Sequence, residues 1–289
     1  MKPNIQVCVF AYNLQSTIAD SLNSLLTSCG EYPVQVYVMI NGCRDHTLSV
    51  VSEFAKRYLN VYPIEITLGD KSNAWNTFVH QYYDGESIAV FADGDLTFAE
   101  LAIAQLVDYH LNNPHFLAVS SFPCLKGRSA QAWRSALLRE HQFTGNLYLL
   151  SPRYIQRIVA NNVRLPTGLI GDDSMLGFLT ATDLCSGKDT PLENIGVCTD
   201  AVFNYEPLNP WRWQDIKLYL RRRVRYSKRH MQQSNIVPKL KRDGLAVMPK
   251  YASQIDTLPI RWLSSNVLFD LIAARAIRKE GKRSAKRLV

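Results

Sequence analysis

The stretch Ile88-Ala-Val-Phe-Ala-Asp-Gly-Asp95 joins a short apolar run to two carboxylates that are separated by one glycine. A run of this length with β-branched members is typical of a strand buried on both faces of a parallel sheet. Charged groups at the end of such a strand are costly unless they are paired or bind a metal ion. Because open α/β sheets bind ligands beyond the carboxyl ends of their strands, we expect Asp93 and Asp95 to face a crevice. The plainer interpretation is an ordinary Asp-Gly turn.

Strand patterns alternate with helix patterns over the first 121 residues. Strands are predicted at 5–11, 34–40, 61–67, 87–92 and 116–121. Helices are predicted from about Ser16, Ser72 and Ala99, and another carries Val50, Val51, Phe54 and Tyr58 on one face. This alternation predicts βαβ units, and hence an α/β fold with a mostly parallel central sheet flanked by helices. The first connection, Tyr12-Asn-Leu-Gln-Ser16, contains neither a dinucleotide-binding glycine fingerprint nor a phosphate-binding loop.

The pattern is less regular after residue 121. Residues 128–141 suit a helix, residues 145–150 suit a strand, and Pro152 can open a further helix. The stretch Leu165-Pro-Thr-Gly-Leu-Ile-Gly-Asp-Asp-Ser174 is predicted to be a turn-rich loop that carries two adjacent carboxylates.

Charge divides the chain into two regions. Residues 211–289 hold 20 of the 33 Lys and Arg but only 5 of the 25 Asp and Glu, a balance of +15 against −7 for residues 1–210. We therefore predict an α/β domain at 1–210 and a basic, mainly helical region at 211–289 that meets anions. Helices are expected there at 211–231 and 262–277, the second with Trp262 and Leu263 in its apolar stripe.

The composition is that of an ordinary globular protein, with 47% hydrophobic and 20% charged residues. No apolar run approaches the ~18 residues of a membrane-spanning helix. The first residues enter a strand pattern without a signal peptide, and the six cysteines are scattered without a Cys-x-x-Cys pair. We therefore expect reduced thiols and a cytoplasmic location.

Polar residues follow each of the first four predicted strands. Since the strand-to-helix turns of a parallel sheet open on one edge, Asn13, the turn at 41–45, the segment 69–76 and the Asp-Gly-Asp stretch should converge. Paired carboxylates without His or Cys neighbours suit a hard divalent cation that shares ligands with a diphosphate, so Mg²⁺ or Mn²⁺ is the expected cofactor. An EF-hand is excluded, because Phe98 stands where that calcium loop needs glycine.

Five short motifs occur in an order and spacing that resemble one enzyme family. They are Val9-Phe-Ala-Tyr-Asn13, Asn41-Gly-Cys-Arg-Asp-His-Thr47, Lys71-Ser-Asn-Ala-Trp-Asn76, Asp93-Gly-Asp95 and Gly171-Asp-Asp173. In this arrangement the chain resembles the family-2 glycosyltransferases, which have a GT-A-like nucleotide-sugar-binding fold with a DxD motif. The resemblance implies an inverting transfer of a sugar from a nucleotide-diphospho-sugar, with a UDP-sugar as the expected donor, to an acceptor hydroxyl.

The resemblance also implies roles for single residues on the donor side. The nucleoside base would be held by Ala11, Tyr12, Asn41 and Asp45, with Lys71 near the base or the diphosphate. Asp95 would bind the metal ion, with Asp93 beside it facing the ion, the ribose and the diphosphate. Two departures from the family pattern, Asp70 in place of glycine and Ile40 in place of an acid, leave the choice of nucleotide open.

On the acceptor side, the resemblance assigns catalysis to Asp173 and its neighbour Asp172. Asp173 would be the general base that removes the proton of the acceptor hydroxyl, which is a poor nucleophile near neutral pH. A direct displacement assisted by one base inverts the anomeric centre. Without the family context, the same residues suit a loop or a helix cap near Ser174.

The stretch Arg222-Arg-Val-Arg-Tyr226 resembles the family's Gln-x-x-Arg-Trp box. Arg222 and Arg225 would then bind the diphosphate, which the planar guanidinium fork suits well. The alternative is a solvated basic face of a helix. His230, one turn further on, could join the metal ligands.

The expected partners are a nucleotide-sugar donor and a carbohydrate or lipid-linked acceptor. The tail carries seven cations between residues 275 and 287, which suits peripheral contact with an anionic membrane, and a solvated tail is the alternative. Two other classes of function stay open: a two-metal nucleotidyl-transferring enzyme and a non-catalytic module that binds anionic membrane or nucleic acid. The acidic first 210 residues argue against nucleic acid as the main partner.

Overall fold

All five strand patterns of the first 121 residues form strands in the computed structural model, which describes residues 2–124, 128–187, 189–205 and 213–285. Within these residues the sheet has eight strands in the order β3-β2-β1-β4-β7-β6-β8-β5. Their bounds are β1 (Ile5–Ala11), β2 (Val34–Asn41), β3 (Val61–Ile66), β4 (Ile88–Asp93), β5 (Thr97–Phe98), β6 (Ala118–Pro123), β7 (Leu147–Leu150) and β8 (Ile195–Asn204). Strands β1 to β4 are mutually parallel, β6 pairs in parallel with β8, and β7 and β5 are antiparallel to their neighbours. The predicted α/β fold with a mostly parallel sheet is confirmed.

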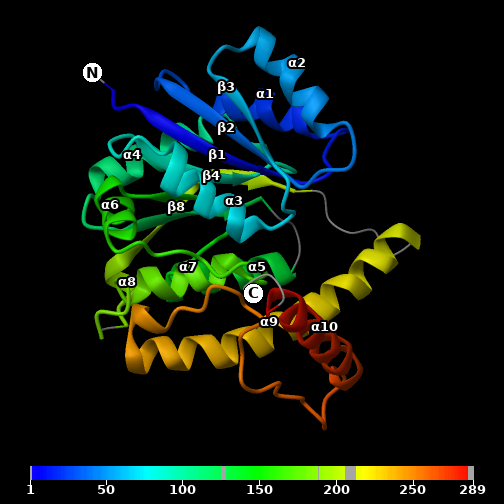
Figure 1. Cartoon of the computed structure of the whole chain (residues 1–289). Helices are drawn as coiled ribbons and strands as arrows, with labels where there is room; N and C mark the ends of the chain where they lie inside the picture. Colours follow the sequence, from blue (N-terminus) through cyan, green and yellow to red (C-terminus); the bar gives the residue numbers. More distant parts are fainter. Residues whose placement is uncertain (1, 125–127, 188, 206–212, 286–289) are drawn as a thin grey trace.

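Helices cover both faces of the sheet (Figure 1). The helices are α1 (Ile18–Ser28), α2 (Thr47–Arg57), α3 (Lys71–Thr77), α4 (Ala102–Asn112), α5 (Arg128–Glu140), α6 (Pro152–Ala160), α7 (Asp172–Ala181), α8 (Pro191–Asn194), α9 (Trp213–Asp243) and α10 (Val267–Ala285), with a π-helix η1 (Phe78–Tyr82) and a 3-10 helix η2 (Leu245–Val247). Alternate residues of β4 belong to two separate cores: Val90 packs with α1, α2 and α4, while Phe91 packs with α3, α6 and α7. Burial on both faces explains the unbroken apolar run of β4.

Several predicted helix starts differ from the observed ones. The N-cap of α1 is Thr17 rather than Ser16. Helix α3 begins at Lys71, because the side chain of Asp70 caps it by accepting a hydrogen bond from Asn73 N at 2.7 Å. The predicted helix at 99 starts at Ala102, since residues 97–98 pair with β8, a strand that the sequence patterns did not predict.

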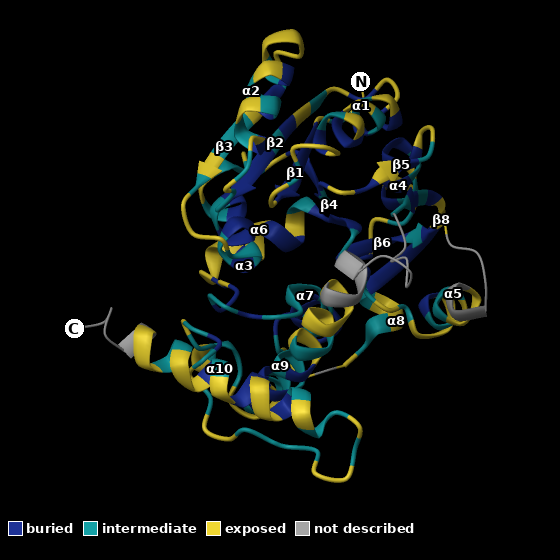
Figure 2. Ribbon diagram, turned by 90° about the vertical axis from the view of Figure 1, so that its right-hand side faces the viewer, coloured by how far each residue is buried: buried dark blue, intermediate teal, exposed yellow. Residues whose placement is uncertain are grey.

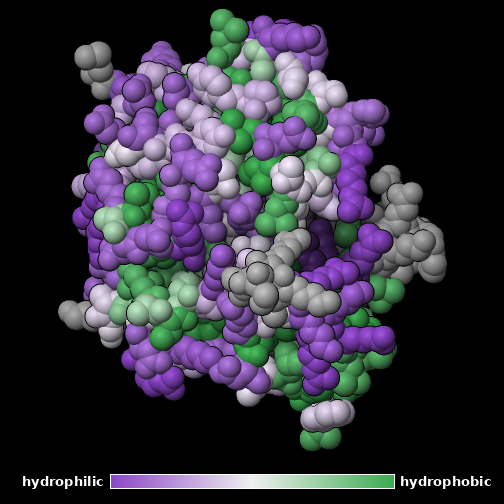
Figure 3. Space-filling view, in the orientation of Figure 1, coloured by the Kyte–Doolittle hydropathy of each residue, from purple (hydrophilic) through white to green (hydrophobic). Residues whose placement is uncertain are grey.

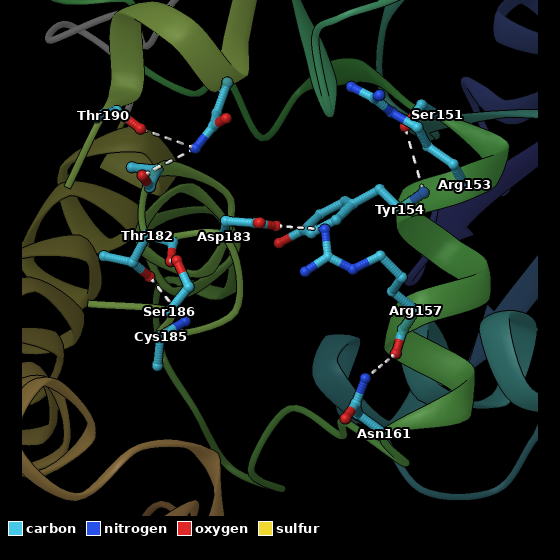
Figure 4. A network of polar contacts seen from close by, with 12 residues as sticks. Ser151, Arg153, Tyr154, Arg157, Asn161, Thr182, Asp183, Cys185, Ser186 and Thr190 are labelled. Atoms are coloured by element: carbon cyan, nitrogen blue, oxygen red, sulfur yellow. Dashed lines mark hydrogen bonds and ion pairs between the residues drawn. The ribbon is translucent and has the colours of Figure 1, made fainter. Parts of the chain in front are cut away.

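The predicted turn-rich loop before Ser174 is wrong at its end, because Asp172 and Asp173 form the first turn of α7. Gly171 precedes them with φ +87, a left-handed conformation that glycine adopts without strain. Acidic side chains are favourable at a helix N-terminus. Figure 4 shows the other end of α7, where Asp183 forms an ion pair with Arg157 of α6 at 2.7 Å.

The two C-terminal helices also differ from their predicted ranges. Helix α9 runs to Asp243, beyond the predicted end at 231, and residues 211–212 of that prediction lie outside the described residues. Helix α10 begins at Val267, so Trp262 and Leu263 lie in the loop before it rather than on a helical stripe. Ser264 Oγ accepts a hydrogen bond from Asn266 N at 3.1 Å, a local turn that competes with helix.

Charged contacts join α10 to α9. Asp270 is fully buried and accepts hydrogen bonds from Arg261 N, Nε and Nη2 at 3.0, 2.9 and 2.6 Å. Arg261 also donates to Ser227 of α9 at 3.1 Å, and Lys228 pairs with Glu280 at 2.6 Å. Hydrogen bonding to Arg261 holds the pKa of Asp270 well below its ordinary value. In the part of the chain that is described, no helix is both long and apolar enough to cross a membrane.

The Arg261–Asp270 contact gives a first prediction. Asp270→Ala removes three hydrogen bonds, two from the partly buried guanidinium of Arg261 and one from its backbone N. We therefore expect the free energy of unfolding, measured in urea, to fall by about 2 kcal/mol. Because folding lowers the pKa of Asp270, its contribution to the free energy of unfolding is present above pH ~4 and is lost as the pH falls further. The difference in stability between the parent protein and Asp270→Ala should therefore become smaller below that pH. The control is Asp256→Ala, which breaks an exposed pair with Lys239 and should change little. Equal effects of the two substitutions would contradict the prediction.

Candidate functional site

The carboxyl ends of β1, β2 and β4 and the start of α7 open onto one cleft of about 750 Å³. Ten of the eleven residues with a predicted site role line it: Ala11, Tyr12, Asn41, Lys71, Asp93, Asp95, Asp172, Asp173, Arg222 and Arg225. The structure therefore brings together residues that are up to 214 positions apart in the sequence. Convergence at one edge is what a parallel sheet imposes on the turns that follow its strands.

Lys71 lies at the centre of the cleft's charged groups. Its Nζ is 2.6 Å from Asp93 Oδ1, 3.4 Å from Asp172 Oδ2 and 3.5 Å from the carbonyl oxygen of Gly145. Burial alone would lower the pKa of Lys71, but the attraction of Asp172 and Asp93 outweighs it and raises that pKa. Lys71 therefore carries its charge at neutral pH and joins α3 to the ends of β4 and α7.

The two acids of the Asp-Gly-Asp stretch have different surroundings. Asp93 is half-buried, and its oxygens accept from Lys71 Nζ at 2.6 Å and from Asn146 Nδ2 at 3.2 Å. Burial, with a smaller contribution from the charge of Asp95, raises the pKa of Asp93 to about 6 although Lys71 opposes the rise. Asp95 is exposed in the cleft and has no hydrogen-bond or ion-pair partner among the described residues. Asp95 is thus the carboxylate that is free to take a ligand.

The donor set suits a hard divalent cation bound together with its substrate. Asp93 and Asp95 supply carboxylate oxygens, which Mg²⁺ and Mn²⁺ accept, and the described residues contain no cluster of three or more His, Cys, Asp or Glu that could enclose a metal alone. Such a site leaves coordination positions for a diphosphate and for water. His230 does not line the cleft, and its nearest polar contact is Ser234 Oγ at 3.5 Å.

Asp172 and Asp173 enter the cleft from the N-terminus of α7 in different ways. Asp172 turns toward Lys71 and is 14% exposed, while Asp173 is 34% exposed and faces Arg229 at 3.6 Å. The backbone at Gly145 passes very close to the second acid: a Cβ there would lie 2.3 Å from the Cβ of Asp173. Position 145 therefore requires glycine because there is no room for a Cβ atom beside Asp173, and not because of its backbone conformation.

Helix α9 closes the cleft with residues at helical spacing. Arg222, Arg225, Tyr226 and Arg229 all line it. The sequence prediction missed Arg229, although its position one turn after Arg225 puts it on the same face of a helix. Gln232, one further turn along, is buried and fixes α9 to the loop before α7: its side chain accepts from Ile170 N at 2.8 Å and donates to Gly168 O at 2.9 Å.

Like His230, the predicted base-binding residue Asp45 does not line the cleft. Its carboxylate accepts hydrogen bonds from Gln15 N at 3.1 Å and from Thr47 N and Oγ1 at 3.1 and 2.6 Å. Burial would raise the pKa of Asp45, but these hydrogen bonds outweigh burial and lower it. Asp45 thus ties the turn after β2 to the turn after β1.

Asp70, where the family pattern has glycine, has a structural task. Besides capping α3, it accepts a hydrogen bond from Gly168 N at 2.6 Å, and its own N donates to Asn41 Oδ1 at 2.8 Å. Burial raises the pKa of Asp70. The residue therefore connects three of the segments that form the cleft.

The model of one protein family, glycosyl transferase family 2, matches residues 6–163, more than half of the chain. The chain belongs to this family. The match begins in β1 and ends just after α6, so it includes the Asp-Gly-Asp stretch but not Asp172, Asp173 or α9. A comparison with curated proteins gave no match.

The solved structures that are similar to this family member include the following three. A mannosyltransferase from Pyrobaculum calidifontis, in complex with GDP-Man and Mn²⁺, aligns with 100% of this chain and 81% of its own, at 19% identity and a TM-score of 0.62. A glucosyl-3-phosphoglycerate synthase from Mycobacterium tuberculosis, with Mn²⁺, UDP-glucose and phosphoglyceric acid, aligns over 78% of each chain, at 18% identity and 0.53. S. aureus TarS with UDP-GlcNAc aligns with 81% of this chain and 72% of its own, at 14% identity and 0.51. At these identities the likeness shows the shared GT-A-type fold.

The charge cluster around Lys71 gives a second prediction. Lys71→Met leaves Asp93 and Asp172 without their cation, so in EDTA-treated buffer we expect the free energy of unfolding to fall by about 2–3 kcal/mol near neutral pH. The pKa of Asp93 in the folded protein, about 6, lies above its ordinary value, so ionisation of Asp93 destabilises the fold, fully above that pH. This loss of stability disappears on acidification, when the carboxyl group takes up a proton. Urea titrations should therefore give a smaller difference at about pH 5 than at about pH 7.5.

The matched control for this cluster is Lys56→Met, which removes a lysine from an exposed pair with Glu53. It should change the stability little at either pH. A pH-independent effect of Lys71→Met would show that its ion pairs do not explain its contribution.

Proposed function

We propose that this protein is a metal-dependent, inverting glycosyltransferase that moves a sugar from a nucleotide-diphospho-sugar to an acceptor hydroxyl. One observation carries the proposal: two carboxylates face the same cleft, which Lys71 and the arginines of α9 also line. That of Asp95 has no partner among the described residues, and that of Asp173 is partly exposed. Membership of glycosyl transferase family 2 supports the class of reaction. The two carboxylates suit the two tasks of such a reaction, which are holding the donor and activating the acceptor.

The donor would lie with its base at the turns after β1 and β2. Ala11, Tyr12 and Asn41 line that end of the cleft and would contact the nucleoside, while Asp45 would keep the two turns together. We propose a UDP-sugar, which two of the three similar structures contain, although the third contains GDP-Man. Lys71 would face the ribose–diphosphate side, beside Asp93.

A divalent ion on the diphosphate would be held by Asp95, with Asp93 next to it. Mn²⁺ accompanies the nucleotide or nucleotide-sugar in two of the similar structures, and Mg²⁺ has the same preference for oxygen. When bound, such an ion stabilises negative charge on the departing diphosphate as a Lewis acid. On the other side of the diphosphate, Arg222 and Arg225 would bind its oxygens through their guanidinium groups.

Asp173 would take the proton of the acceptor hydroxyl. It is the better candidate of the two α7 acids because it is more exposed, whereas Asp172 is engaged by Lys71. Arg229, 3.6 Å away, would orient its carboxylate. A positioned base of this kind contributes typically about 10²–10⁴-fold to the rate. Attack from one side with departure on the other inverts the anomeric centre, and the acceptor would be a carbohydrate or a lipid-linked molecule.

Donor binding gives a third prediction. A UDP-sugar with Mn²⁺, at about 100 times its Kd, should raise the melting temperature by about 5 °C, because a ligand of the folded state adds free energy of unfolding. Asp95→Ala should abolish the shift, whereas Asp20→Ala, an exposed acid on α1, should keep it. A screen of nucleotide-sugars with Mn²⁺ and Mg²⁺ identifies base, sugar and metal together. Release of pyrophosphate in place of a nucleoside diphosphate would identify a nucleotidyl-transferring enzyme and refute the proposal.

The position of the proposed general base, Asp173, gives a fourth prediction. Asp173→Asn should lower kcat by about 10²-fold or more while the donor-induced thermal shift remains. Gly145→Ala should also lower kcat, because the new methyl group overlaps the side chain of Asp173 and displaces it. Gly69→Ala is the matched control in the same cleft, since a Cβ there would meet nothing closer than 3.8 Å. Unchanged turnover in Asp173→Asn, or a product that retains the donor's anomeric configuration, would be incompatible with this mechanism.

A further inference from the structure

The loop before α10 carries two large apolar side chains into solvent. Trp262 is 67% exposed and Leu263 is fully exposed. Next to them, Leu268, Leu271 and Ile272 on the first turns of α10 are 61%, 43% and 46% exposed. In Figure 3, apolar surface gathers at the lower right, where Figure 1 draws α10. We call these five residues the apolar tip.

The fold holds this loop in its exposed position. Both the backbone N and the guanidinium of Arg261 donate to the buried carboxylate of Asp270. Trp262 N donates to Ile260 O at 3.1 Å, and Ser264 N donates to Arg261 O at 3.1 Å. The side chains of Trp262 and Leu263 are therefore presented outward by a hydrogen-bonded turn that is fixed to α10.

The exposed face of α10 changes from apolar to cationic along its length. Its opposite face, with Ala273, Ala274 and Ile277, packs against Met231 of α9. On the outer face, helical spacing continues the line of Leu268, Leu271 and Ile272 with four exposed cations: Arg275, Lys279, Lys282 and Arg283. One helix thus presents two apolar turns followed by a basic stripe. Figure 2 shows exposed residues, in yellow, recurring along α10.

Ion pairs within the described residues do not neutralise these cations. The acids of α10, Asp270 and Glu280, are engaged by Arg261 and Lys228. None of the four outer cations forms an ion pair with the part of the chain that the structure describes. The face therefore needs an anionic partner that also accepts apolar side chains.

We propose that the apolar tip and the basic stripe of α10 dock the protein on an anionic lipid bilayer. Tryptophan is favoured at the membrane–water interface, where its ring enters the headgroup region. Each cation near an anionic leaflet strengthens binding, and an apolar signal combined with a basic one gives firmer binding than either alone. Trp262 and Leu263 insert, and the four cations bind lipid phosphates.

Other occupants fit this face less well. A symmetric dimer through the apolar tip would bring the cationic stripes of two copies near each other, and like charges repel. Nucleic acid would satisfy the cations, but its phosphate backbone offers nothing to the aliphatic side chains of Leu263 and Leu268. A bilayer satisfies both halves of the face.

The docking surface is also fixed relative to the cleft. Arg223 Nη2 of α9 donates to Asn266 at 2.7 Å, and Lys228 pairs with Glu280, so α10 and its loop are attached to the helix that carries Arg222 and Arg225. A bound membrane would therefore hold the cleft in one orientation. A fixed orientation suits the transfer of a sugar to a lipid-linked acceptor. That suggestion about the acceptor rests on the proposed glycosyl transfer, but the proposal of membrane docking does not depend on it.

The fifth prediction tests docking by co-sedimentation of the full chain with vesicles of phosphatidylcholine alone or mixed with phosphatidylglycerol. We expect binding to the mixed vesicles, weakened by salt, and little binding to phosphatidylcholine. The double substitution Trp262→Ser, Leu263→Ser should lower the partition coefficient about tenfold or more. Lys279→Gln with Lys282→Gln should also lower the partition coefficient about tenfold or more, because two charges that attract the anionic leaflet are lost. Leu59→Ser, at an 84% exposed leucine after α2, is the control and should bind as the parent does.

All of these substitutions lie at exposed positions, so melting curves should stay close to that of the parent and a failure to fold is separable from a failure to bind. Equal binding to both vesicle types, or unchanged binding after loss of Trp262 and Leu263, would overturn the proposal. So would a lipid-free dimer that the Trp262 and Leu263 substitutions dissociate, or a preference for duplex DNA over vesicles. Vesicle binding without sugar transfer would refute only the proposed enzyme activity, and sugar transfer to a soluble acceptor without vesicle binding would refute only the docking.

Discussion

The cleft depends on one ammonium group placed among carboxylates. Five aspartates, at positions 70, 93, 95, 172 and 173, line it, and like charges so close together repel by several kcal/mol at an effective dielectric near ~20. Lys71 lies within 3.4 Å of two of them, and Arg229 faces a third. Asp70 is satisfied by backbone hydrogen bonds. Asp95 is left without a countercharge among the described residues, which supports the proposal that a divalent cation binds there.

The sequence predicted the half of the site that the sheet builds. Strands buried on both faces are recognisable because every position is apolar, and their carboxyl ends must share an edge once they are parallel. The positions of Asn41, Asp93 and Asp95 at the cleft follow from that rule, whereas Ala11 was assigned only through the family resemblance and Asn13, which the rule also named, does not line the cleft. The rule does not say which acid is paired: Asp93 rather than Asp95 is engaged because Lys71 and Asn146 reach it, and those contacts span 22 and 53 residues.

The half of the site formed by α7 and α9 was harder to predict, because long-range contacts decide it. Whether Asp172 and Asp173 lie in a loop or a helix depends on Gly171, which adopts a left-handed conformation where Arg229 packs against it. Strand β8 was missed because exposed Thr199 and Asp200 interrupt its apolar run. Trp262 and Leu263 follow a helical apolar spacing, yet the Ser264 turn and the Arg261–Asp270 contact stop the helix short of them. Arg229, in contrast, was predictable from helical spacing.

The register of α9 couples the two halves. Gln232 fixes this helix to the backbone on both sides of Leu169, and helical geometry then sets where Arg229, Arg225 and Arg222 lie. The same helix carries Ser227 and Lys228, which hold the Arg261 loop and α10 from the opposite side. A displacement of α9 would therefore move the candidate base's neighbour, the candidate diphosphate ligands and the apolar tip together. Because one rigid helix serves all three, a surface that binds α10 can orient the cleft without contacting it.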